Sequence, residues 1–240
     1  MDSVASLKIT LLLAACASTH LAYTDPNLPV KVDEAQKFSG GDLLSRIYRW
    51  EIMLMKGLLW ASTLSEVAVL ISLQYPSDAS EQILQLLARK GTSSLSRLNI
   101  TPLFIAGSLM QIAGYLIRRV CFQTLGRHFT FALAVRDDHR LVTEGPYSVV
   151  RHPSYTGGVM VFVGMLLMQF GRGSWWAECG PSSTATGRAL ELLWTANVLG
   201  AAVMLILRTV KEDEVLRREF GTQWDKWAEH TRYRLVPGLY

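Results

Sequence analysis

Five apolar blocks, each close to the length of a bilayer-spanning helix, are the feature of this sequence that most constrains its fold. They cover roughly residues 4–22, 51–73, 98–117, 155–171 and 189–207. A helix needs about 20 mostly apolar residues to cross the roughly 30 Å core of a bilayer. Hydrophobic residues make up 50% of the chain and charged residues only 18%, a balance unlike that of a soluble domain. The sequence therefore predicts an all-α, polytopic integral membrane protein with about five transmembrane helices.

The first two blocks contain charged residues that a lipid environment disfavours. Lys8 precedes a short apolar run, so residues 4–22 are also compatible with a cleaved signal peptide, and Leu13 to Cys16 resembles a bacterial lipobox. Glu66 is costly at membrane depth, and pairing with another helix is its favoured interpretation.

Two segments between the blocks have their own patterns. Residues 75–97 predict a loop followed by a short amphipathic helix on the membrane surface. Trp175 and Trp176 suit the aromatic belt at a membrane interface.

The basic residues between the blocks predict an orientation. Residues 118–154 and 208–240 are the richest in Lys and Arg, and the short connections on the other side are poorer. Because cytosolic loops carry an excess of Lys and Arg, both segments are expected in the cytosol. The sequence therefore predicts that residues 118–154 and the C-terminal segment meet on one side of the membrane.

The net charge of +4 and the pI near 9.0 do not require a nucleic-acid partner. Cations that flank membrane helices explain them, and the sequence contains neither an aromatic-basic stripe nor zinc-finger spacing. Cys16, Cys121 and Cys179 share no CxxC spacing, so no cysteine metal site is predicted.

The first cluster that topology does not explain lies just before the fourth block. It consists of Gly145-Pro146-Tyr147 and then Arg151-His152-Pro153-Ser154-Tyr155-Thr156-Gly157. Pro153 is suited to the first turn of a helix. An Arg-His pair beside a helix N-terminus combines charge, ring nitrogens and free N–H groups, which favours the binding of an anionic group.

The second cluster follows the fifth block. Arg208 and Glu212 are four residues apart, so they share one face of a continuing helix. Glu212, Asp213 and Glu214 form three consecutive acids that orientation rules do not require. An exposed ion pair and a functional site remain equally compatible with this pattern.

These two clusters together resemble the isoprenylcysteine carboxyl methyltransferase family. The resemblance extends over about 115–240 and includes Phe220-Gly221, Trp224 and Trp227. Asp213 stands where the family commonly has a second Glu, and the two tryptophans replace its usual tyrosines. Ala132 falls where the family often has Gln or Glu. The resemblance divides the chain into N-terminal spans at 1–97 and a methyltransferase catalytic domain at 98–240.

The resemblance implies an enzyme of the endoplasmic reticulum membrane whose active site faces the cytosol. It would use S-adenosyl-L-methionine to methylate the C-terminal carboxylate of S-farnesyl or S-geranylgeranyl cysteine, on prenylated CAAX-type proteins or on prenylcysteine small molecules. Arg208 would bind the substrate carboxylate and act with Glu212 in catalysis. The cofactor would contact His139, Arg140, Leu141, Val142, Tyr147, His152, Pro153, Ser154, Tyr155 and Glu212. No metal is implied.

The chemistry of that reaction agrees with the residue types present. An α-carboxylate has a pKa of about 3.5, so it is ionised at neutral pH and needs no general base. No GxGxxG turn of a soluble nucleotide fold occurs in the chain. The cofactor site is therefore expected at helix ends and in the C-terminal segment.

Three other functions remain open at this stage. A phospholipid or small-lipid methyltransferase would share the cofactor site but would methylate an amine. Membrane sterol reductases resemble the C-terminal part and use NADPH. A membrane scaffold would keep the fold without turnover.

Overall fold

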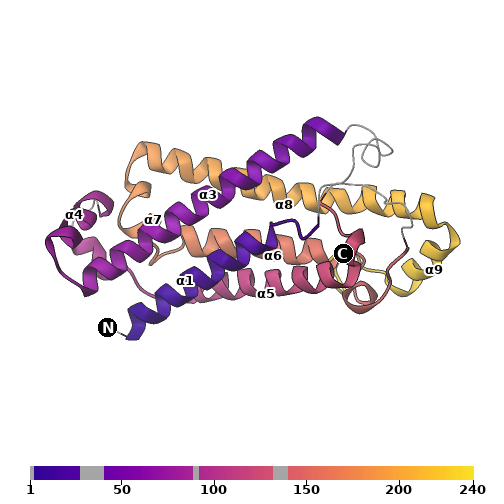
Figure 1. Ribbon diagram of the computed structural model, residues 1–240, viewed down its shortest axis with the longest axis horizontal. Coiled ribbons are helices and arrows are strands. Elements are labelled where there is room, and N and C mark those ends of the chain that lie inside the picture. The colour runs from indigo at the N-terminus through magenta and orange to yellow at the C-terminus, as the bar shows by residue number, and fades with distance from the viewer. Residues whose placement is uncertain (1–2, 28–40, 89–91, 132–139) are drawn as a thin grey trace. The chain divides into compact units, whose positions relative to one another are not determined.

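The computed structural model describes residues 3–27, 41–88, 92–131 and 140–240, in which helices are connected by short turns and no strand occurs. The long helices are α1 (Ser3–Ala22), α3 (Gly41–Gln74), α5 (Pro102–Leu125), α6 (Pro153–Phe170) and α8 (Ala185–Phe220) (Figure 1). The shorter ones are α4 (Asp78–Leu87), η1 (Thr92–Arg97), η2 (Gly126–His128), η3 (Gly145–Ser148), α7 (Trp175–Glu178), η4 (Pro181–Ser183) and α9 (Thr222–His230).

The prediction of a multi-span helical protein is confirmed. Five helices within the described residues are long and apolar enough to cross a membrane: Ser3–Ala22, Trp50–Gln74, Pro102–His128, Pro153–Glu178 and Ala185–Phe220. The amphipathic helix predicted within residues 75–97 is present as α4.

Helix starts follow local backbone chemistry more closely than they follow hydropathy. The third span was expected from residue 98, but α5 begins at Pro102. Proline disfavours a helical conformation for the residue before it, and the Thr101 hydroxyl accepts a hydrogen bond from the Phe104 N–H at 3.1 Å. The predicted start of the fourth span at Pro153 is confirmed.

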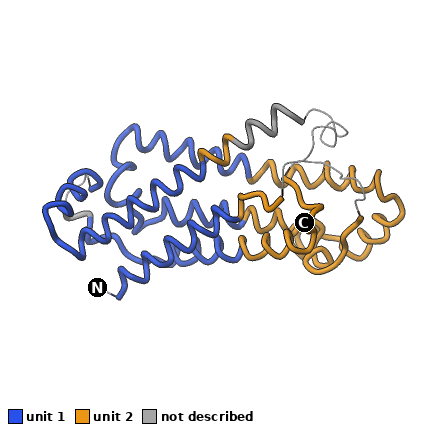
Figure 2. The backbone as a smooth tube through the Cα atoms, viewed as in Figure 1, with its two compact units in different colours: residues 1–21, 55–113, 160–201 blue, residues 22–54, 114–159, 202–240 orange. Residues whose placement is uncertain are grey.

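The described chain forms two compact units, each assembled from several separate segments (Figure 2). Unit 1 contains residues 1–21, 55–113 and 160–201, and unit 2 contains residues 22–54, 114–159 and 202–240. The sequence analysis divided the chain by function, with N-terminal spans at 1–97 and a catalytic domain at 98–240. The compact units do not test that division, so it stays a prediction.

Unit 1 has an apolar core crossed by one buried ion pair. Its core consists of Leu12, Ala15, Val67, Leu70, Phe104 and Met168. Lys8 Nζ lies 2.6 Å from Glu66 Oε1 and donates to the Gly173 carbonyl, while Glu66 Oε2 accepts from the Trp175 N–H at 3.0 Å. The expected pairing of Glu66 with another helix is confirmed.

The two adjacent tryptophans of unit 1 pack inside that unit. Trp175 and Trp176 are buried. Trp176 packs edge-on against Phe170 and Trp194, and the Trp175 indole donates to the Leu87 carbonyl at 2.8 Å. The expected place of these residues in an interfacial belt stays a prediction.

Glycines allow α5 and α6 to approach closely. In unit 1, a Cβ added to Gly107 would lie 2.6 Å from the Gly164 carbonyl oxygen. In unit 2, a Cβ added to Gly157 would lie 2.6 Å from the Gly114 carbonyl oxygen. Small residues at such crossings let helix backbones pack directly in membranes.

Unit 2 gathers the end of α5, η3, the start of α6, the end of α8, α9 and the C-terminal segment. Its core consists of Cys121, Val142, Tyr147 and Trp227. Residues after α1 also belong to it, because the Tyr23 hydroxyl donates to the Gly158 carbonyl and the Asn27 amide donates to the carbonyls of Gly126 and Phe129.

Candidate active site

A pocket in unit 2 brings together most of the site residues predicted from the sequence. Those that line it are Leu141, Val142, Tyr147, His152, Ser154, Tyr155, Arg208 and Glu212. Pro153 and Arg140 are not among the lining residues, and Arg140 is exposed. His139 and Ala132 lie outside the described residues.

The loop before α6 is fixed to the C-terminal segment by backbone hydrogen bonds. The Arg151 N–H donates to the Tyr233 carbonyl at 2.9 Å, and the His152 N–H donates to the Arg234 carbonyl at 2.8 Å. Gly145 has a φ of 58°, a left-handed conformation that glycine adopts without strain and that begins η3. The turn therefore presents the first residues of α6 to the pocket.

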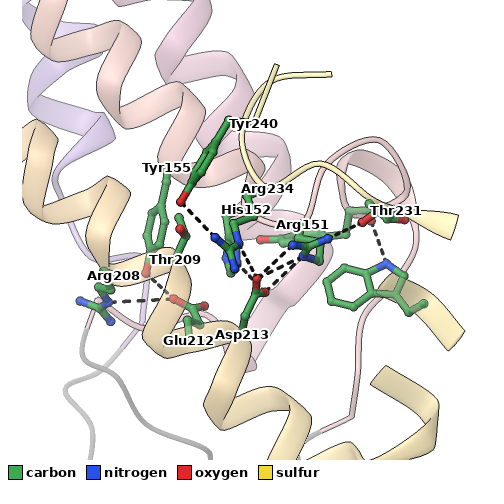
Figure 3. A network of polar contacts seen from close by, with 12 residues as sticks. Arg151, His152, Tyr155, Arg208, Thr209, Glu212, Asp213, Thr231, Arg234 and Tyr240 are labelled. Atoms are coloured by element: carbon green, nitrogen blue, oxygen red, sulfur yellow. Dashed lines mark hydrogen bonds and ion pairs between the residues drawn. The ribbon is translucent and has the colours of Figure 1, made fainter. Parts of the chain in front are cut away.

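Asp213 is the centre of a buried network of charges (Figure 3). Its carboxylate accepts from Arg151 Nη2 at 3.1 Å and from Arg234 Nε at 2.9 Å, and it lies 2.9 Å from His152 Nε2. Arg151 Nη1 donates to the carbonyls of Thr231 and Arg232. The anion that Arg151 and His152 contact is therefore Asp213 of the same chain.

Arg208, Glu212 and Tyr155 form a second, more open group in the pocket (Figure 3). The Tyr155 hydroxyl donates to Glu212 Oε2. Arg208 Nε lies 4.0 Å from the same oxygen, and both side chains are nearly 30% exposed. This ion pair is loose, so it contributes only a few tenths of a kcal/mol. Arg208 and Glu212 can therefore exchange this contact for a ligand at small cost.

Aromatic rings surround these charged groups. The Tyr155 ring stacks on the His152 ring at 5.6 Å between centroids, and the Arg208 guanidinium lies 5.9 Å from the Tyr155 ring centre. The Trp227 indole donates to the Tyr147 carbonyl at 3.1 Å. Burial raises the pKa of the Tyr147 hydroxyl well above its ordinary value, so this group is neutral at physiological pH.

Sequence reasoning did not identify two features of this site. Asp213 was noted only as a departure from a family pattern, and the signal that it differs from its neighbours was the unexplained run of three acids. Arg118 was counted only as a basic residue that helps to set orientation, yet its side chain is buried and lines the pocket.

The fold and site define a multi-span helical membrane protein with a mixed-charge, aromatic pocket at helix ends. Comparison with known proteins is consistent with this class. Residues 107–174 match the family described as isoprenylcysteine carboxyl methyltransferase (ICMT). The sequence resemblance predicted a match to this family.

Curated relatives extend the match. The chain is 30% identical over 125 residues to "Probable protein-S-isoprenylcysteine O-methyltransferase" of Oryza sativa subsp. indica, covering 51% of this chain and 56% of the relative. It is 41% identical over 71 residues to "Protein-S-isoprenylcysteine O-methyltransferase" of Rattus norvegicus, covering 29% of this chain and 25% of the relative. The chain therefore spans about half the length of the rice relative.

A relative with a different printed activity also matches. The chain is 24% identical over 145 residues to "Delta(14)-sterol reductase" of Neurospora crassa, covering 48% of this chain and 26% of that protein. The similarity thus extends to a second enzyme class.

Proposed function

We propose that this chain transfers a methyl group from S-adenosyl-L-methionine to the C-terminal carboxylate of an S-farnesyl or S-geranylgeranyl cysteine, giving a methyl ester. The observation that carries the proposal is the presence of Arg208, Glu212 and Tyr155 in one pocket. The printed activities of the rice and rat relatives support the same reaction.

The residues of the pocket fit S-adenosyl-L-methionine, which would supply an electrophilic methyl group on a sulfonium. Glu212 offers a carboxylate to an ammonium or hydroxyl group, and the Tyr155 ring offers a π face to a cation. Leu141 and Val142 supply apolar wall. Tyr147, His152 and Ser154 are proposed as further contacts, as are Pro153, Arg140 and His139 from the family resemblance.

Arg208 would orient the substrate carboxylate. A guanidinium can grip a carboxylate with two parallel hydrogen bonds. Arg208 is suited to this because its Nη1 is anchored on the Phe131 carbonyl at 2.7 Å while its contact with Glu212 is loose. A grip that persisted only in the ground state would slow the reaction, so Arg208 acts by positioning.

The pocket has two further tasks, which are to align the two reactants and to exclude water. The acceptor carboxylate is already ionised at pH 7, so no residue has to remove a proton. Holding two reactants in line can supply roughly 7–11 kcal/mol of the barrier. Apolar residues of the pocket wall, including Leu205 and Leu216, would reduce the hydration of the carboxylate before attack.

The surroundings of the site support a membrane-bound substrate. We propose that the prenyl chain enters from the lipid, and that prenylated CAAX-type proteins or prenylcysteine small molecules supply the carboxylate. The excess of Lys and Arg in residues 118–154 and 208–240 supports a cytosolic site, and the family resemblance supports the endoplasmic reticulum membrane.

The test uses membranes containing the full chain, labelled S-adenosyl-L-methionine and N-acetyl-S-farnesylcysteine, with base-labile methyl ester as the readout. The wild type is expected to form ester. Arg208→Ala is expected to abolish turnover while S-adenosyl-L-methionine binding is largely retained. Lys211→Ala is the matched control, because Lys211 is exposed on the same helix and does not line the pocket. Loss of cofactor binding in Arg208→Ala would refute the role assigned to Arg208.

A sterol reductase is the second candidate, because of the Neurospora crassa relative. Binding of NADPH in place of S-adenosyl-L-methionine would favour it. Cofactor binding without ester formation would favour another lipid acceptor, and binding of neither cofactor would favour a scaffold.

A further inference from the structure

Arg118, in the second half of α5, is among the most deeply buried side chains of the protein. It is only 2% exposed, yet it lines the same pocket as Arg208. Its guanidinium carbon lies 5.0 Å from the ring centre of Tyr23 and 5.2 Å from those of Phe122 and Phe131. Three aromatic rings therefore enclose a charge in the pocket wall.

Specific contacts hold the Arg118 side chain in place. Its Nε donates to the Ala22 carbonyl at 2.7 Å, and its Nη1 donates to the carbonyl and hydroxyl of Ser154 at 3.0 and 3.2 Å. Glycines leave room for it, since a Cβ on Gly157 would lie 3.0 Å from Arg118 Cγ and one on Gly158 would lie 3.3 Å from Nη1. The guanidinium is thus fixed before any ligand arrives.

Among the residues that the structure describes, Arg118 has no counter-charge, unlike Lys8 and Arg151. Lys8 pairs with Glu66 in unit 1, and Arg151 pairs with Asp213 in unit 2. Across residues 3–27, 41–88, 92–131 and 140–240, Arg118 donates only to uncharged oxygens, and its Nη2 group donates to none. A buried cation without an anionic partner is costly, and an anionic ligand in the pocket would remove that cost.

We propose that Arg118 binds a ligand carboxylate in this pocket through Nη2. This inference rests on the proposed function and deepens it, because it assigns a second carboxylate-binding cation besides Arg208. Both reactants carry such a group: the methionine part of S-adenosyl-L-methionine and the cysteine end of the prenylated substrate. Arginine suits this task because its guanidinium has five N–H donors, so Nη2 can bind a carboxylate while Nε and Nη1 hold the side chain in place.

The test compares ligands that differ only in the carboxylate. The full chain in nanodiscs is titrated with S-adenosyl-L-methionine and its decarboxylated analogue, and with N-acetyl-S-farnesylcysteine and its carboxamide. Arg118→Gln is expected to weaken one carboxylate ligand about tenfold to a hundredfold and to leave its carboxylate-free partner nearly unchanged. Arg119→Gln is the matched control, because it removes the same charge from an exposed position on the same helix.

The ligand whose affinity falls in Arg118→Gln identifies which reactant supplies the carboxylate. A selective loss for S-adenosyl-L-methionine supports the cofactor, and a selective loss for the prenylcysteine supports the substrate. Equal losses for both members of each pair, or no loss, overturn the inference and leave Arg118 as a structural residue, while ester formation by the wild type still supports the proposed function. A wild type that binds none of the four ligands overturns both.

Thermal unfolding shows whether each variant is folded. If Arg118→Gln does not fold, Arg118→Lys takes its place in the titrations. The ammonium keeps the charge, but its three donors on one atom cannot hold the Ala22 and Ser154 contacts and reach a ligand carboxylate as well. The affinity for the carboxylate ligand is expected to fall several-fold more than the affinity for its carboxylate-free analogue. An equal change in both affinities overturns the inference.

Discussion

Glu212 and Asp213 are adjacent carboxylates with different tasks, because successive helical residues point about 100° apart. Asp213 is buried, and its oxygens contact the side chains of Arg151, His152 and Arg234. Glu212 is partly exposed, lines the pocket and contacts Tyr155. Asp213 is therefore assigned to the architecture of the site and Glu212 to ligand binding.

Replacing Glu212 by Ala is expected to weaken S-adenosyl-L-methionine binding about tenfold to a hundredfold, because one charge-assisted contact is lost. Calorimetry on the purified protein measures this affinity. Glu214→Ala, at an exposed position two residues further along α8, should bind normally. An unchanged affinity in Glu212→Ala would count against the assignment.

Replacing Asp213 by Asn is expected to destabilise unit 2 by about 3–5 kcal/mol, since the buried Arg151 guanidinium loses its anionic partner. Thermal unfolding measures the stability, and limited proteolysis should reveal faster cleavage within residues 231–240. Asp225→Asn is the control, because Asp225 pairs with Arg217 on the surface, where such pairs contribute about 0–1 kcal/mol. Equal effects of the two substitutions would contradict the buried role.

Among the elements, α1 shows how far charge patterns predict structure. The sequence indicated that Glu66 would need a partner but did not identify Lys8, which was noted only as the cation before the short apolar run of the first block. The two residues are 58 positions apart, and their contact depends on how α1 packs against α3 within unit 1. The cost of a buried charge can thus be predicted from sequence, whereas the partner that offsets it requires the fold.

The single substitutions Lys8→Met and Glu66→Gln are each expected to lower the stability of the folded protein by about 3–5 kcal/mol. The double variant should lose less than the sum, because neither charge is then left alone. Thermal unfolding in detergent gives the interaction free energy. Additive losses would show that the pair is not coupled.

At the scale of the whole molecule, the sequence patterns predicted five spans, the matching family and eight of the residues that line the pocket. The long-range contacts were beyond the sequence. The end of α1 and the residues after it illustrate this. Ala22, Tyr23 and Asn27 support unit 2 through one carbonyl and two side chains that no local pattern distinguishes. Hydropathy describes each span but not its neighbours.

The rate of the proposed methyl transfer is expected to be nearly independent of pH between about 6.5 and 8.5. The acceptor carboxylate has a pKa of about 3.5, and the raised pKa of Tyr147 keeps that hydroxyl protonated throughout. Initial rates of ester formation across this interval provide the measurement. A steep rise with pH would indicate an amine acceptor that must first lose a proton.

The glycine contacts of α5 and α6 restrict how this gene can vary. Gly107 and Gly114 are seven residues apart on one helix, as are Gly157 and Gly164 on the other. Every amino-acid replacement at a glycine adds at least one carbon, and at three of these positions that carbon would fall within 3 Å of backbone atoms. A random mutagenesis library selected for folded protein should therefore be depleted of substitutions at Gly107, Gly157 and Gly164.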